Sequence, residues 1–122
     1  MQWLPYEDPI AHASEELVLQ YNPNWSGAGE RKHPIAIAEE WLAYFTVTHQ
    51  MEIDLDVPFT RESWNGRMKA CRGIGASLPP EKIAAWEAEH LQLLERIAPE
   101  SFSVRHYAAL AELTKKSKKE VK

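Results

Sequence analysis

The strongest pattern in the 122-residue chain is a strict alternation of side chains from residue 45 to residue 57. The odd positions are apolar except His49, and the even positions are polar. Successive side chains of a strand point to opposite faces, so this period of two predicts a long strand with one wet face, which Pro58 ends. At roughly 3.3 Å per residue the strand would span about 43 Å, so we expect a bulge or an irregular start.

Helix signals precede this strand. Asp8-Pro9 has the form of an N-cap followed by a first-turn proline, and Asn22-Pro23 ends the helix that it starts. A second helix is expected from about Pro34 through the segment IAIAEEWLAYF. The chain therefore combines helices with at least one strand.

A third helix is expected directly after the strand, within the segment ESWNGRMKACRGIGASL. Thr60 can cap its N-terminus, and Gly73 or Gly75 would cap its C-terminus. Its apolar stripe has the spacing of one helix face and consists of Trp64, Met68 and Cys71.

The fourth and longest helix is expected between Pro79-Pro80 and Pro99, with an apolar stripe along its length. The stripe consists of Ile83, Trp86, His90, Leu93, Leu94 and Ile97. The segment FSVRHYAALAEL, residues 102–113, is ambiguous because strand formers begin it and helix formers end it. Residues 114–122 are Lys-rich, carry no apolar stripe and are expected to be disordered.

The overall composition excludes several classes of protein. Lys plus Arg is 14 and Asp plus Glu is 18, and a net charge of −4 argues against a dedicated nucleic-acid binder. No apolar run approaches the roughly 20 residues that span a bilayer, and the N-terminus lacks the form of a signal peptide. A single cysteine, Cys71, favours a reducing compartment. We therefore expect a cytoplasmic protein that binds neither membrane nor nucleic acid.

The motifs that can carry chemistry all have structural explanations as well. Gly27-Ala28-Gly29 and Gly73-Ile74-Gly75 follow a loop and a helix end, whereas a phosphate-binding turn needs a strand before it. Asp54 and Asp56 could form a carboxylate pair or a solvated strand face. The five histidines show no metal-ligand spacing with Cys71, which reads as a small buried hydrophobe.

Two arginines, Arg67 and Arg72, flank the stripe of the third helix. Each could bind a substrate carboxylate or lie on the surface. No complete active site is visible, and one long strand with one doubtful strand is too few for an independent sheet. The chain therefore reads as an incomplete α/β unit: an antiparallel strand pair, about 45–57 and 102–113, packed by about four helices.

Several segments together resemble the C-terminal half of class I S-adenosylmethionine-dependent methyltransferases, most closely the bacterial proteins often labelled type 11. The segments are WLPYEDPI, EELVLQYNPNW, IDLDVPFTRESWNGRMKACRGIGASL and FSVRHYAALAEL. The resemblance covers residues 3–113, and it implies one unit, 1–113, that is the C-terminal part of a Rossmann-like methyltransferase sheet. The family's glycine-rich turn and acidic cofactor residue belong to an N-terminal half that this sequence does not contain.

The resemblance also implies a strand order. Residues 1–5 would be the end of a central strand, and the last strand, 102–113, would insert antiparallel beside it. The strand 45–57 would then form the edge of the sheet, in keeping with its polar positions.

The resemblance further implies that residues 62–78 form a helix-and-loop cover beside a substrate pocket for a small molecule. Trp64 and Arg67 would face or brace this pocket, and Tyr21 and Trp25 of the YNP-x-W pattern would contribute to it. This chain would bind no cofactor by itself, whereas full-length members of the family bind S-adenosylmethionine. The catalytic residues are not identified by the resemblance, and no metal site is expected.

Two functions of different classes stay open. In the first, the chain is the substrate-side portion of a methyltransferase, inactive without the missing N-terminal half. In the second, it is a stand-alone, non-enzymatic domain that acts through homo-oligomerisation or partner binding at its exposed sheet edge.

Overall fold

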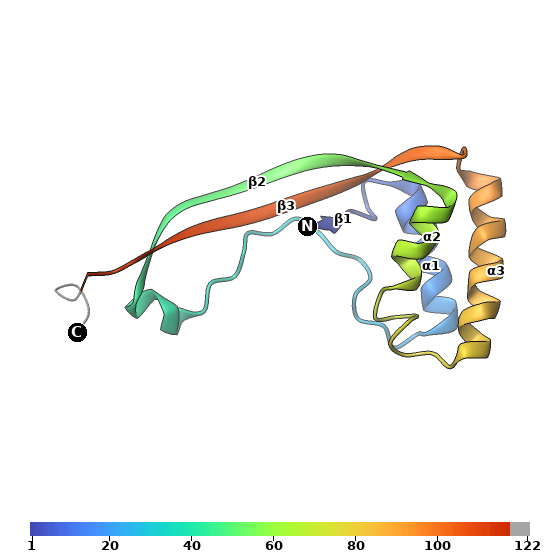
Figure 1. Ribbon diagram of the computed structural model, residues 1–122, viewed down its shortest axis with the longest axis horizontal. Coiled ribbons are helices and arrows are strands. Elements are labelled where there is room, and N and C mark those ends of the chain that lie inside the picture. Colours follow the sequence, from blue (N-terminus) through green and yellow to red (C-terminus); the bar gives the residue numbers. More distant parts are fainter. Residues whose placement is uncertain (118–122) are drawn as a thin grey trace.

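The computed structural model describes residues 1–117, which form a three-stranded antiparallel sheet and three α-helices (Figure 1). In chain order the elements are β1 (Gln2–Trp3), α1 (Pro9–Tyr21), the 3-10 helix η1 (Glu39–Ala43), β2 (Phe45–Thr60), α2 (Arg61–Lys69), α3 (Pro80–Ile97) and β3 (Ser101–Lys115). The mixed α/β class expected from the sequence is therefore observed.

The sheet has the order β1-β3-β2, with β3 in the centre and antiparallel to both neighbours. Trp3 of β1 and Leu55 of β2 both lie opposite His106 of β3. The predicted pairing of the 45–57 and 102–113 segments is confirmed. Since both outer strands oppose β3, they run parallel to each other on its two sides.

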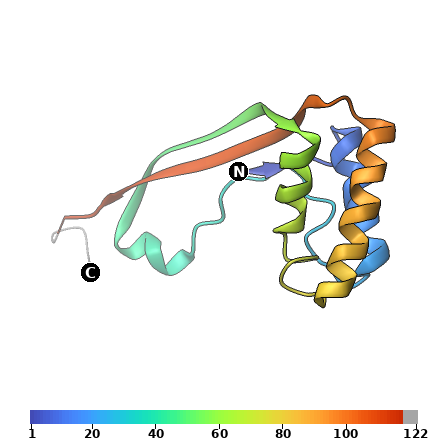
Figure 2. The same cartoon turned by 45° about the vertical axis from the view of Figure 1, so that its right-hand side comes forward.

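The sheet is much longer than the layer of helices. In both views β2 and β3 form a twisted ribbon that extends away from the helices, which gather at one end of it (Figures 1 and 2). We call the free part of this ribbon, residues 45–53 and 108–115, the arm. The helices can cover the sheet only at the end opposite the arm.

β2 is longer than predicted, because Pro58 lies inside it and the strand continues to Thr60. Pro58 pairs in register with Ser103. Proline is tolerated in an edge strand, where the missing N–H removes no bond from the sheet interior. The expected irregularity is present as a register shift between Val47 and His49.

β3 also extends beyond its predicted end. Thr114 and Lys115 pair with Thr46 and Phe45 of β2. The prediction that disorder begins at residue 114 is therefore wrong for these two residues. Residues 118–122 of that tail lie outside the described residues. Pairing with β2 along its whole length outweighs the helix propensity of AALAEL, because strand preference depends strongly on tertiary context.

The helix expected from Pro34 does not form. Residues 34–38 have no regular structure, and only the short η1 follows them, with no buried residue. A short isolated helix is marginal in water unless it packs an apolar face. Trp41 and Leu42 of η1 are exposed, so the packing that would stabilise a longer helix is missing. Residues 1–117 therefore contain three α-helices rather than the four expected.

The helices α1 and α3 have the predicted ends. The Asp8 side chain accepts bonds from the backbone N–H groups of Ile10 and Ala11, and α1 stops at Tyr21. α3 starts behind Pro79 with Pro80 in its first turn. Capping side chains and first-turn prolines satisfy or remove the unpaired N–H groups at these ends.

One core joins the helices to the sheet. Its buried residues come from β1, β3, all three helices and the turn after α2: Trp3, Ala11, Leu17, Val18, Trp64, Met68, Ile74, Trp86, Leu94, Ala98 and Val104. On the sheet, the apolar face continues from Val57 opposite Val104 to Ile53 opposite Ala108 and Met51 opposite Leu110. Val104 is fully buried, whereas Ile53, Met51 and Leu110 are exposed. The apolar face is therefore covered only beside the helices.

Candidate functional site

A capping box fixes where α2 begins. The Thr60 hydroxyl accepts a bond from the backbone N–H of Ser63 (3.0 Å), and the Ser63 hydroxyl accepts one from the backbone N–H of Thr60 (2.8 Å). This reciprocal pair was expected from Thr60. It places Trp64 and Arg67 three residues apart on neighbouring positions of α2.

Trp64 points into the core and is fully buried. Its ring meets Trp3 and Phe59 edge-on, with centroids 5.6 Å and 5.0 Å away. Trp64 is therefore a core residue that joins α2 to the sheet.

Arg67 is half-buried and lies over the indole of Trp3, with Cζ 4.6 Å from the ring centroid. Among residues 1–117 no carboxylate lies within ion-pair distance of its guanidinium, and no acceptor bonds to it. The Trp3 ring is itself fixed, because its Nε1–H donates to the buried carboxylate of Glu15 (2.6 Å). Arg67 is thus an unpaired cation on a rigid aromatic ring.

His106 lies directly opposite Trp3 in the sheet and is 2 % exposed. Its Nδ1–H donates to the backbone carbonyl of Val104 (2.9 Å), and its ring stacks on Phe59. Burial lowers the pKa of His106, and the positive charge of Arg67 lowers it further. The imidazole is therefore neutral near pH 7, with Nε2 as a hydrogen-bond acceptor.

A buried polar network lies on the other side of α2. Asn65 Nδ2 donates to His90 Nδ1 (3.0 Å), so His90 Nε2 carries the hydrogen and donates to Ser14 Oγ (2.8 Å). Trp64 Nε1–H donates to the same oxygen (2.9 Å). Trp86 stacks on the His90 ring at 4.7 Å. These bonds join all three helices, so the network holds the helical layer together.

Burial lowers the pKa of His90 from 6.5 to about 4. Between these pH values His90 binds a proton in the unfolded state but not in the folded state. Lowering the pH therefore stabilises the unfolded state relative to the folded state. Well above pH 6.5, His90 is neutral in both states and does not lower the free energy of unfolding. We expect the free energy of unfolding to fall by about 2 kcal/mol between about pH 7.5 and about pH 5 from this residue alone.

Denaturant unfolding across this pH range measures the effect. His90→Gln should lower stability at neutral pH and remove this part of the pH dependence, whereas His49→Gln, at an exposed strand position, should keep it. The part of the slope that comes from the lowered pKa of His106 should remain, whereas a slope unchanged in His90→Gln would assign the pH dependence to other groups.

Tyr21 and Trp25 have structural partners away from Arg67. The Tyr21 hydroxyl donates to Glu89 of α3 (2.8 Å), and this bond raises the pKa of Tyr21. Trp25 packs against the turn after α2, where Asn22 Nδ2 donates to the carbonyl of Gly73 (3.0 Å). The YNP-x-W segment thus packs against the Gly73 turn. The four residues expected to line the pocket, Tyr21, Trp25, Trp64 and Arg67, do not meet in one cavity.

Neither Gly73 nor Gly75 serves as the expected C-cap, because α2 ends at Lys69 with Ala70 as its C-cap, and neither glycine has a positive φ. Both are needed for close approach instead. A Cβ on Gly73 would lie 2.7 Å from Val18 Cγ1, and one on Gly75 would lie 2.7 Å from the Lys69 carbonyl oxygen. The segment after α2 is a tight structural turn.

The remaining sequence candidates have structural roles. Asp54 pairs with Lys32 (2.7 Å) and Asp56 with Arg105 (3.4 Å) at the surface. Gly29 has φ of 77° and its N–H donates to Glu15 (2.9 Å), so the first G-x-G segment is also a structural turn. Burial raises the pKa of the half-buried Cys71 thiol, which keeps it protonated. Residues 1–117 contain no cluster of side chains suited to a metal ion.

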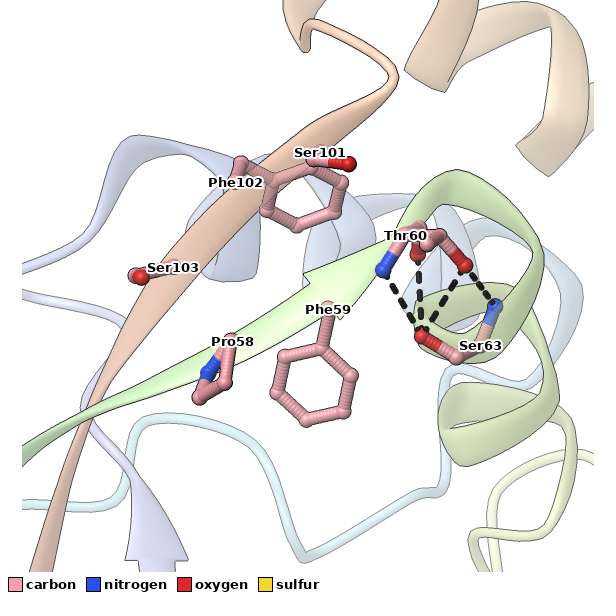
Figure 3. A pocket seen from close by; sticks show the side chains of 7 residues that line it. All are labelled: Pro58, Phe59, Thr60, Ser63, Ser101, Phe102 and Ser103. Atoms are coloured by element: carbon pink, nitrogen blue, oxygen red, sulfur yellow. Dashed lines mark hydrogen bonds between the residues drawn. The ribbon is translucent and has the colours of Figure 1, made fainter.

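A surface depression of about 510 Å³ lies where β2 leads into α2. Figure 3 shows two aromatic rings, Phe59 and Phe102, among four hydroxyl side chains. The hydroxyls of Thr60 and Ser63 bond to each other and to the backbone in the capping box. They are occupied by the helix start rather than free for chemistry.

Trp3, Glu15 and His106 were not identified as site residues from the sequence. Period-two alternation in 102–113 places His106 on one face with Phe102 and Val104, so the sequence does contain a signal for its burial. Its position opposite Trp3 depends on the strand register, which no local pattern specifies.

None of the helices in residues 1–117 is long and apolar enough to cross a membrane. No model of a known protein family matches the chain, and it matches neither a curated protein nor a solved structure.

Proposed function

We propose that this chain is the substrate-side portion of an S-adenosylmethionine-dependent methyltransferase of the type that its sequence resembles. The observation that carries the proposal is the strand order β1-β3-β2 with β3 antiparallel. The resemblance implies this order, with the last strand inserted beside a central strand and 45–57 at the edge. Local patterns in the sequence do not imply it.

The open edge of β1 supports the same proposal. The backbone N–H of Leu4 donates to the carbonyl of Arg105 (2.9 Å), so by alternation the N–H and carbonyl of Trp3 point away from β3. A two-residue strand with a free edge is a poor end for a sheet. Further strands beside β1 would satisfy these groups.

The described residues do not fit the cofactor by themselves. Neither G-x-G segment follows a strand and opens a helix, as a nucleotide-binding turn requires. The N–H of Gly29 donates to Glu15, and the N–H groups of Ile74 and Gly75 donate to the Cys71 carbonyl, so these donors are already used. The role that we propose for this chain within the methyltransferase is therefore to bind the methyl acceptor.

Association with the missing half tests the proposal. The glycine-rich N-terminal half of a type 11 methyltransferase, mixed with this chain, should give a one-to-one complex in size-exclusion chromatography with light scattering. The DNA upstream of the Met1 codon should encode such a half. Absence of both the complex and the upstream half would contradict the proposal.

The exposed arm favours a second candidate, a stand-alone domain that acts through homo-oligomerisation. Large apolar side chains cluster on the arm and the segment before it: Ile35, Trp41, Leu42, Tyr44, Met51, Ile53 and Leu110. Exposed apolar surface of this kind is typical of an interface. We expect a dimer or larger species by light scattering at tens of micromolar.

A matched pair of variants tests whether the arm causes this association. Ile53 on the arm and Leu91 on α3 are each 38 % exposed. Ile53→Gln should shift the equilibrium toward monomer, whereas Leu91→Gln should not. A wild-type chain that stays monomeric would exclude this second candidate.

A further inference from the structure

A second surface depression lies at the end of the helical layer away from the sheet, where the segment after α1 meets the turn after α2 (Figures 1 and 2). Its volume is about 310 Å³, which leaves room for one small molecule, because ligand pockets begin at about 300 Å³. Its walls are mostly polar and are formed by Asn22, Asn24, Trp25, Ser26, Arg72 and Ser77.

Hydrogen bonds and close packing hold the two sides of the depression together. Asn22 Nδ2 donates to the carbonyl of Gly73 (3.0 Å), 51 residues further along the chain. The Ser77 hydroxyl donates to the carbonyl of Arg72. Trp25 packs so closely on Gly73 that a Cβ there would lie 2.8 Å from Trp25 Cγ. The walls therefore need little ordering when a ligand binds.

Of the described residues that line the depression, Arg72 alone is charged. Among residues 1–117 no carboxylate lies within ion-pair distance of its exposed side chain, and no aromatic ring lies under its guanidinium. One guanidinium fork matches one carboxylate in both charge and geometry. A phosphate monoester carries about −1.5 to −2 charge at pH 7, which a single arginine does not neutralise. The charge of the site therefore favours a monocarboxylate.

The neutral groups of the depression suit the alcohol groups of a ligand. No hydrogen bond within residues 1–117 engages the side chains of Asn24 and Ser26, and both residues are exposed. The Ser77 oxygen can still accept, because only its hydrogen is used by the Arg72 carbonyl. Amide and hydroxyl groups both donate and accept, as an alcohol does.

We propose that this depression binds a hydroxylated monocarboxylate of the sugar-acid class, with its carboxylate on Arg72. The ligand's hydroxyl groups bond to Asn24, Ser26 and Ser77. Two segments far apart in the sequence, YNPNWS at 21–26 and RGIGASL at 72–78, thereby form one site. The binding does not rest on the proposed function, because groups of this chain alone recognise the ligand.

The probes are D-glucuronate and D-gluconate, a cyclic and an open-chain sugar acid. Acetate lacks the hydroxyl groups, glucose lacks the carboxylate, and glucose 6-phosphate carries a phosphate instead. Each is titrated near neutral pH and at low salt against the 15N-labelled chain. At least one sugar acid should shift the amide signals of residues 24–26 and 72–78 saturably in the millimolar range, because the charged contact is exposed to solvent. It should bind about tenfold more tightly than acetate or glucose.

Two sets of variants separate the two kinds of contact. Arg72→Gln should weaken binding of the sugar acid about tenfold, whereas Arg96→Gln, at an exposed arginine in the last turn of α3, should leave it unchanged. Asn24→Ala combined with Ser26→Ala should reduce binding of the sugar acid to that of acetate. All four positions are exposed, and unfolding in urea verifies that each variant folds.

Absence of saturable shifts with both sugar acids would overturn the site. So would equal effects of Arg72→Gln and Arg96→Gln, a preference over acetate that survives in the Asn24 and Ser26 variant, or tighter binding of glucose 6-phosphate. None of these outcomes bears on the complex with the glycine-rich half, so failure of the site and failure of the proposed function are distinguishable.

Discussion

Trp64→Ala should destabilise the chain by about 3–5 kcal/mol, which is enough to unfold a marginal domain. Trp64 is fully buried, it contacts Trp3 and Phe59 edge-on, and its Nε1–H donates to Ser14 in the network that joins the helices. The change removes aromatic packing and a buried hydrogen bond together. Denaturant unfolding followed by circular dichroism measures the cost.

Two variants control for this result. Trp64→Phe keeps most of the ring and should cost clearly less, because Ser14 still accepts from His90. Arg67→Ala should cost below about 1 kcal/mol, since its half-buried guanidinium has no ion-pair partner among residues 1–117. If Trp64→Ala lowered the free energy of unfolding only as much as Arg67→Ala does, the indole would be solvent-exposed and would belong to an open pocket.

Gly75→Ala should cost about 1–3 kcal/mol, the usual range for an overpacked site. Its Cβ would lie 2.7 Å from the carbonyl oxygen of Lys69, a backbone atom that can move only if the end of α2 moves. The cost therefore reports how firmly the turn is packed under α2. Equilibrium unfolding in urea gives this value.

Gly66→Ala is the matched control, because Gly66 lies in α2 and a Cβ there would meet nothing within 4 Å. Alanine is the better helix former, so this variant should stabilise the chain by about 0.5–1 kcal/mol. A neutral Gly75→Ala would contradict the close packing of the turn.

Local signals in the sequence predict the elements that local chemistry determines. The Asp8 cap, the Thr60 capping box and the alternation after Phe45 each specify an element through neighbouring residues. The end of β2 was predicted wrongly at Pro58, because a proline ends a strand only where its N–H is needed. Whether a strand lies at the edge of a sheet is a property of the whole fold.

The helix expected after Pro34 shows that local helix propensity is not sufficient without tertiary packing. Its sequence has helix formers, yet Trp41 and Leu42 find no surface to pack against. Intrinsic propensity is too weak to hold such a short helix alone. The missing packing is of the kind that a larger sheet or a second copy of the chain would supply.

Prediction of the candidate site was partial for the same reason. Arg67 could be identified from its place on the third predicted helix, whereas Trp3 and His106 join it only through the register of β1 with β3. Tyr21 and Trp25 belong to a pattern that the structure explains through Glu89 and Gly73. A sequence motif alone does not separate a ligand contact from a packing contact.

Calorimetric titration of S-adenosylmethionine tests the central claim most directly. The chain alone should give no saturable heat at millimolar cofactor, because neither G-x-G segment forms a nucleotide-binding turn. The complex with the glycine-rich half should bind the cofactor saturably. Micromolar binding by this chain alone, or no binding by the complex, would contradict the assignment of the chain to the substrate side of a methyltransferase.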